Sequence, residues 1–139
     1  MKVITSSISR QTKGVCDIHD ITQDVQTEVL KSGMGDGTVT VFIPGSTAGI
    51  TTIEFEPGLK KDLPELFEKL APTGVTYHHD ATWGDGNGFS HVRAALLGAS
   101  LVVPFSAAQL HLGTWQQIVL IDFDNRSRQR KVVVQIMGQ

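Results

Sequence analysis

The sequence predicts a single α+β domain over residues 1–139, built from a mixed or antiparallel β-sheet and about three helices. Its length of 139 residues is typical of one domain. Strand-like and helix-like segments do not alternate strictly, which argues against a doubly wound parallel sheet. No internal repeat and no linker-like stretch divides the chain. These three observations define the fold class, and each element follows from a local pattern.

The first half of the chain is expected to supply four strands and one helix. The strands are predicted from alternating apolar residues, and they cover residues 2–8, 14–18, 38–43 and 50–55. The helix has Asp20 as its predicted N-cap, an apolar stripe through Val25 and Val29, and Gly33 as its stop. Pro44 and Gly45 separate the third and fourth strands.

The second half is expected to add two helices and the remaining strands. One helix begins near Pro57, and Pro64 inside it predicts a kink or a restart with Asp62 as a new cap. The other starts on Ser90 and ends at Gly98. Residues 78–89 are predicted to be a glycine-rich irregular loop. The remaining predicted strands are residues 74–77, 100–105, 114–123 and 130–137.

The last two predicted strands are joined by a short polar turn, so we expect them to form a β-hairpin. Their apolar residues fall on both faces, which predicts cover by helices on one side and by a neighbouring subunit on the other. Charged residues make up only 19 % of the chain, below the average of about 25 %, and this also favours self-association.

Charge and cysteine content exclude several classes of function. Twelve Lys and Arg against fourteen Asp and Glu give a net charge of −2, so no overall field favours nucleic acid or an anionic membrane. A basic cluster nevertheless lies within residues 126–131. The single Cys16 allows no internal disulfide and is interpreted as a packed strand residue. With no apolar segment of membrane-spanning length, we expect a cytoplasmic location.

The most informative segment for chemistry is residues 77–91, which holds three of the five histidines together with two aspartates and an asparagine. His and Asp side chains can bind a transition metal or exchange protons near neutral pH. The alternative is that the Asp-Gly and Asn-Gly pairs are ordinary turns and the histidines decorate the surface. The cluster favours a functional site, in which the candidates are His79, Asp85, Asn87 and His91.

Two further segments carry candidate residues. The small and hydroxyl residues 44–49 could offer N–H and O–H groups to a phosphate, and Thr47 lies among them. In the following strand, Glu54 shares one face with Thr52 and Glu56, where it would serve a metal, act as a base or simply face solvent. Trp115 and Gln116 alternate in the predicted strand 114–123, so one packs while the other can reach a ligand.

Four segments resemble the YjbQ-like family: residues 46–54, 79–91, 96–101 and 112–118. They follow in order along nearly the whole chain, and the stretch from Ser100 to Gly113-Thr114-Trp115-Gln116 is the most specific. The resemblance implies a compact α+β homotrimer with a secondary thiamine-phosphate synthase activity. This chain has Gly45 and Gly86 where many members have a histidine and a second acid. The positions that match family motifs are Thr47, Glu54, His79, Asp85, Asn87, His91, Thr114, Trp115 and Gln116.

Three functional hypotheses follow. The first is a transferase that joins a pyrimidine methyl pyrophosphate to a thiazole phosphate with the help of a divalent cation, Mg²⁺ or Zn²⁺. Its expected catalytic residues are Glu54, His79, Asp85 and His91, and its expected ligand-binding residues are Thr47, Thr52, Asn87, Thr114, Trp115 and Gln116. The second is a metal-assisted hydrolase using His79, His91 and Asp85, in which the two histidines hold zinc and a carboxylate activates water. The candidate metal ligands are His79, Asp85 and His91. The third is a protein that binds a small phosphorylated metabolite without turnover.

Overall fold

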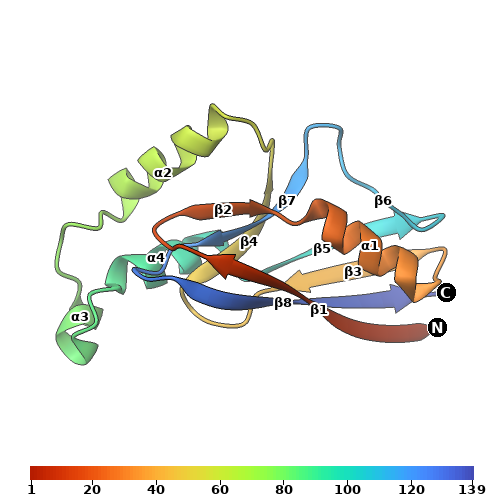
Figure 1. Cartoon of the computed structure of the whole chain (residues 1–139), viewed down its shortest axis with the longest axis horizontal. Helices are drawn as coiled ribbons and strands as arrows, with labels where there is room; N and C mark the ends of the chain where they lie inside the picture. Colours follow the sequence, from red (N-terminus) through yellow and green to blue (C-terminus); the bar gives the residue numbers. More distant parts are fainter.

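The computed structural model describes residues 1–139 as two stacked β-sheets with four helices (Figure 1). The strands are β1 (Lys2–Thr12), β2 (Asp17–Asp20), β3 (Gly37–Phe42), β4 (Ala48–Ile53), β5 (Ser100–Ser106), β6 (Gln109–Leu110), β7 (Gln117–Asp122) and β8 (Arg128–Gly138). The helices are α1 (Thr22–Ser32), α2 (Leu59–Leu70), α3 (His78–Trp83) and α4 (Gly88–Leu97). The predicted α+β class is confirmed.

Every strand pair is antiparallel. The larger sheet has the order β1-β8-β3-β5-β6, and the smaller has the order β2-β7-β4. Lys2 pairs with Gly138 across β1 and β8, so the two chain ends lie side by side (Figure 1). None of the four helices reaches the length and apolarity that a membrane-crossing helix needs.

The main core fills the space between the sheets. Val41 and Val134 of the larger sheet belong to the same apolar cluster as Ile50 and Leu120 of the smaller one. On the other face of the smaller sheet, Val119, Ile121 and Phe123 pack against Phe67 of α2 and Ala94 of α4. Strand β7 is therefore buried on both faces inside one chain. The expectation that a neighbouring subunit covers one face was therefore wrong for β7, whereas for β8 it stays a prediction.

The outer face of the larger sheet has no helix over it, because α1 packs on the inner side with the smaller sheet. The outward positions follow from the register of β1, β8, β3 and β5. Val3, Phe42, Val102 and Met137 are exposed there, among Ser, Thr and Gln side chains, and Lys131 is the one charged residue. This face is therefore unusually poor in charge for a surface in water.

The predicted β-hairpin of the last two strands was also wrong. Strand β7 already has β2 and β4 on its two edges, whereas β8 lies between β1 and β3 in the other sheet. Residues 123–127 thus carry the chain from one sheet to the other. The crossing is tied down because Asp122 and Asp124 on one side pair with Arg130 and Arg128 on the other.

Other differences are local. Residues 78–83 form α3 instead of loop, residues 74–77 form no strand, and β7 begins only at Gln117. Helix α2 runs through Pro64 without a restart at Asp62. The N-cap of α1 is Ile21, one residue after Asp20, and that of α4 is Asn87, so Ser90 lies in the first turn. The predicted glycine ends at Gly33 and Gly98 are confirmed.

Candidate functional site

A cleft of about 420 Å³ opens where the start of β4, the α3–α4 loop and the start of β8 meet. We call it the His/Arg cleft. It is lined by Gly45, Ser46, Thr47, His79, Trp83, Asp85, Asn87, His91, Arg128 and Arg130. Nine of these ten residues are polar or glycine, so the cleft suits a polar ligand.

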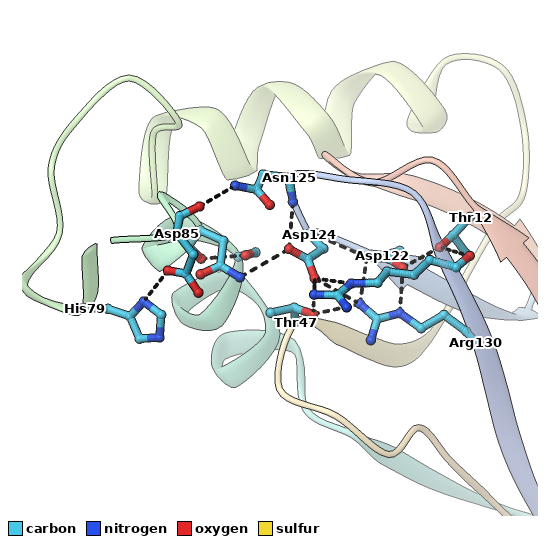
Figure 2. Close-up of polar contacts among 11 residues, drawn as sticks. Thr12, Thr47, His79, Asp85, Asp122, Asp124, Asn125 and Arg130 are labelled. Carbon is cyan, nitrogen blue, oxygen red and sulfur yellow. Dashed lines mark hydrogen bonds and ion pairs between the residues drawn. The ribbon is translucent and has the colours of Figure 1, made fainter. Parts of the chain in front are cut away.

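One wall of the cleft is made by two histidines and a carboxylate. The rings of His79 and His91 lie against each other with centroids 4.1 Å apart. His79 Nδ1 is 3.6 Å from Asp85 Oδ1, a contact drawn in Figure 2. Nδ1 is buried and makes no hydrogen bond. The Asp85 carbonyl accepts a bond from Asn125 Nδ2 at 2.8 Å, which fixes this exposed loop to the β7–β8 crossing.

Asp80 explains why the segment after Tyr77 is helical. Its carboxylate accepts the backbone N–H groups of Tyr77 at 2.9 Å and Gly88 at 2.8 Å, and the Tyr77 bond is part of a capping box at the start of α3. These backbone hydrogen bonds lower the pKa of Asp80. Asp80 also lies 4.0 Å from His79 Nδ1, and one ligand atom from each of His79, Asp80 and Asp85 falls within 4.8 Å of the others.

His91 contributes a neutral ring to this wall. Burial lowers its pKa, and the neighbouring His79 lowers it further. The neutral imidazole has a free lone pair, which is the form that binds metals. The wall therefore collects donor atoms of the types that Zn²⁺ and Mg²⁺ accept.

The opposite wall is a buried network of charged and hydroxyl groups (Figure 2). Arg130 donates from Nε to Asp122 Oδ2 at 2.6 Å and from Nη2 to the Thr47 hydroxyl at 2.7 Å. The Thr12 hydroxyl donates to the same Asp122 oxygen at 2.5 Å. Arg128 Nε donates to Asp124 Oδ2 at 2.7 Å. Both aspartate side chains are fully buried, so each arginine is held in one orientation.

The pKa values of the two aspartates show that both stay ionised. Burial on its own raises them, but hydrogen bonds outweigh it and leave both values lower than usual. For Asp122 the main bonds come from Arg130 and Thr12, and for Asp124 they come from Asn87 and the Asn125 backbone. The network is thus two ion pairs that cancel in charge.

Several hydrogen-bonding groups at the cleft remain free. Arg130 Nη1 and Arg128 Nη1 donate to no group of the chain, and neither do the backbone amides of residues 45–47. Gly45 has φ +108°, and a Cβ there would lie 3.2 Å from Arg130 Nη1. Asn87 is 95 % buried, yet its Oδ1 has no partner. Free buried polar groups of this kind are uncommon and call for a ligand or water.

The structure brings together five of the predicted site residues: Thr47, His79, Asp85, Asn87 and His91. Thr52 and Gln116 line a different cavity of about 440 Å³, where Gln116 Nε2 donates to the Thr52 hydroxyl at 3.2 Å. Thr114 and Trp115 are exposed in the loop before β7. Glu54 is exposed after the far end of β4, a strand that spans roughly 20 Å from Thr47. Within one chain, Glu54 therefore does not reach His79.

Sequence reasoning missed the arginine wall as a unit. The cluster within residues 126–131 was visible, but only the strand alternation of β8 separates inward Arg128 and Arg130 from outward Lys131. Their partners Asp122 and Asp124 gave the complementary signal, because alternate carboxylates followed an otherwise apolar strand. Arg93 is not part of this wall: it is 1 % exposed and donates to Glu68 and to the Ala71 carbonyl, away from the cleft.

These features define the class of protein: a small domain of two antiparallel sheets with a polar cleft at their junction. The chain belongs to the family described as UPF0047 protein YjbQ-like, whose sequence model matches residues 6–139. The resemblance seen in the sequence is thereby confirmed.

Relatives match over most of their length. A UPF0047 protein of Archaeoglobus fulgidus is 41 % identical over 121 residues, which cover 87 % of this chain and 91 % of that protein. A second, from Methanothermobacter thermautotrophicus, is 34 % identical over all 139 residues and 95 % of its own length. A crystal structure of a YbjQ-like protein of unknown function from Sulfolobus solfataricus superposes with a TM-score of 0.93 at 33 % identity, covering 99 % of each chain. The fold is therefore the fold of this family.

Proposed function

We propose that the His/Arg cleft binds a divalent cation together with the phosphate or pyrophosphate end of a small metabolite. The observation that carries the proposal is the chemical contrast between the two walls. One wall offers the metal-binding groups His79, Asp85 and His91, and the other offers free N–H groups of Arg128, Arg130 and the loop 45–47. A cation bound to phosphate oxygens needs both kinds of wall.

Charge supports the same assignment. The ion pairs of the arginine wall cancel, whereas Asp80 and Asp85 have no arginine or lysine within ion-pair distance. The unbalanced negative charge would repel a phosphate and attract a divalent cation. The buried Nδ1 of His79, which has no hydrogen bond, is a position that a metal could satisfy.

The reaction that we propose is the transfer expected of a thiamine-phosphate synthase. The C–O bond between a pyrimidine methylene and its pyrophosphate breaks, and the electron pair leaves with pyrophosphate. The ring nitrogen of a thiazole phosphate then forms the new C–N bond. The cation supplies charge neutralisation for the leaving group. The N–H groups of Arg128, Arg130 and the backbone of residues 45–47 would hold the leaving pyrophosphate and keep it from recombining with the pyrimidine methylene.

A metal-assisted hydrolase is the second candidate. It is favoured by one observation, namely that two histidines and a carboxylate stand together, which is the donor set of many catalytic zinc sites. In that case the same arginine wall would bind a phosphate ester. A third outcome, binding without turnover, remains distinct from both.

The family-motif residues outside the cleft, among them Glu54 and Gln116, would contribute to a site at a boundary between subunits. We propose a homotrimer, supported by the charge-poor outer face of the larger sheet. Sedimentation equilibrium of the purified protein tests it: a trimer mass is expected, and a monomer at micromolar concentration would reject it.

The function is tested by calorimetric titration of Mg²⁺, Mn²⁺ and Zn²⁺ with and without pyrophosphate, and by mass spectrometry of the product from the two heterocyclic substrates. Asp85→Asn should weaken cation binding and turnover by about tenfold or more. The matched control is Glu65→Gln, which removes an exposed carboxylate of α2 outside the cleft and outside the family-motif segments, and should change neither. Stoichiometric zinc with phosphate release would favour the hydrolase. Equal behaviour of the two variants would reject the site.

A further inference from the structure

A second hollow adjoins the His/Arg cleft and differs from it in chemistry. It encloses about 350 Å³ and shares Gly45, Ser46 and His91 with the cleft. We call it the alanine hollow, because its remaining lining residues are Ala48, Ala94, Ala95, Gly98 and Ala99. The two cavities therefore meet along the loop at residue 45 and the ring of His91.

Apart from Ser46 and the ring of His91, the walls of the alanine hollow are methyl groups and backbone. No arginine, lysine, aspartate or glutamate lines it. A charged group placed there would lose its hydration without gaining a partner. The hollow therefore suits an uncharged group whose surface is mainly apolar, and its size suits a single ring better than a larger assembly.

Its floor is held in place by the fold. The carbonyl of Gly98 accepts the N–H of Ile50 at 3.0 Å, and the carbonyl of Ala99 accepts the N–H of Ile43 at 2.9 Å. These bonds tie the end of α4 to β4 and to the end of β3. At Gly98, with φ +94°, no atom lies within 4 Å of the position that a Cβ would take. The hollow is thus a preformed space and not a gap that side chains can close.

An independent observation points to a ligand in the His/Arg cleft itself. The buried side chain of Asn87 lines the cleft with a free Oδ1, while its Nδ2 is fixed by Asp124 at 3.2 Å. The orientation of the amide is therefore set, and its acceptor is available for a donor on a bound molecule.

We infer that the cleft and the alanine hollow form one two-part site for a phosphate ester of a small, flat, uncharged ring. This inference rests on the proposed function, since the phosphate must lie against Arg128 and Arg130. The ring would lie in the alanine hollow, one or two bonds from the phosphate. Ala95 then determines specificity, because it stands at the open side of the hollow, where a larger side chain would occupy the space of the ring.

The inference is tested by the affinities of three probes, measured by calorimetry in MgCl₂: inorganic phosphate, methyl phosphate and benzyl phosphate. Benzyl phosphate should bind about tenfold more tightly than methyl phosphate, because its ring leaves water for the hollow. In Ala95→Leu this preference should vanish while inorganic phosphate binds as before. The control is Val92→Leu, which adds bulk to an exposed position of the same helix outside both cavities.

The outcomes separate the two proposals. If no probe binds the wild-type protein, the anion wall and everything resting on it are rejected. If all three bind equally, the phosphate site stands and the ring site is rejected. A preference for benzyl phosphate that survives in a folded Ala95→Leu protein also rejects the alanine hollow as its origin. Circular dichroism of both leucine variants confirms that they are folded.

Discussion

Replacing Arg130 with Met should destabilise the protein by about 3 kcal/mol, although Met keeps much of the side-chain volume. The change removes three charge-assisted hydrogen bonds, two of them to Asp122, whose side chain is fully buried. Breaking a buried ion pair costs about 3–5 kcal/mol, because the remaining charge is unpaired. Asp122 keeps the Thr12 hydroxyl and the N–H of Asp124, so the cost should fall at the lower end.

Urea unfolding followed by circular dichroism measures this loss. With an m-value of about 2 kcal/mol/M, the midpoint should drop by about 1.5 M. Arg126→Met is the matched control, since it makes the same substitution at an exposed arginine of the β7–β8 crossing; its effect should stay within about 0.5 kcal/mol. Adding Asp122→Leu to Arg130→Met should recover at least half of the loss by removing the unpaired charge. If Arg130→Met costs no more than the control, the reasoning about the buried pair is refuted.

Two further predictions concern ionisation. Asp122 and Asp124 have native pKa values below the ordinary aspartate value of 3.8, so the unfolded chain binds protons first on acidification; their contribution to stability is complete above that value and is lost as the pH falls through the lowered native pKa values. The difference in urea midpoint between the wild-type protein and Asp122→Asn should therefore be constant from pH 7 to about 5 and shrink below about 4, whereas a difference that stays constant throughout would contradict this origin. Burial raises the pKa of Cys16 to about 11, so its thiol should react with a disulfide reagent at pH 7.5 far more slowly than free cysteine; a rate equal to that of free cysteine would disprove the packed position.

Local pattern predicted the elements better than their partners. The apolar stripe through Val25 and Val29 and the stop at Gly33 gave α1 almost as it is. The β7–β8 hairpin failed because a short polar turn says only that two strands are near each other in sequence. Which sheet each strand joins depends on partners about a hundred residues away, such as β1 for β8. Helix α3 was missed because its stability comes from the Asp80 carboxylate accepting the backbone N–H groups of Tyr77 and Gly88, and such local side chain–backbone bonds give no periodic signal.

The candidate site could be predicted in part because its histidine wall lies in one continuous segment, residues 79–91. The arginine wall could not, since Thr12, Thr47 and Asp122 come together only when the two sheets are stacked. Glu54 and Gln116 show the converse limit. Both lie on motif segments that flank the cleft in sequence, yet β4 and the loop before β7 carry them to other parts of the surface.

The network beneath the cleft has a consequence for the order of folding events. The hydrogen bond from Thr12 to Asp122 joins residues 110 positions apart, and that from Arg130 to Thr47 joins residues 83 apart. Contacts of such sequence separation form late, after the loops between them have been closed. We therefore expect the arginine wall to form only once both sheets are in place. A ligand that binds there binds only the completed native state, and it shifts the folding equilibrium towards that state by mass action.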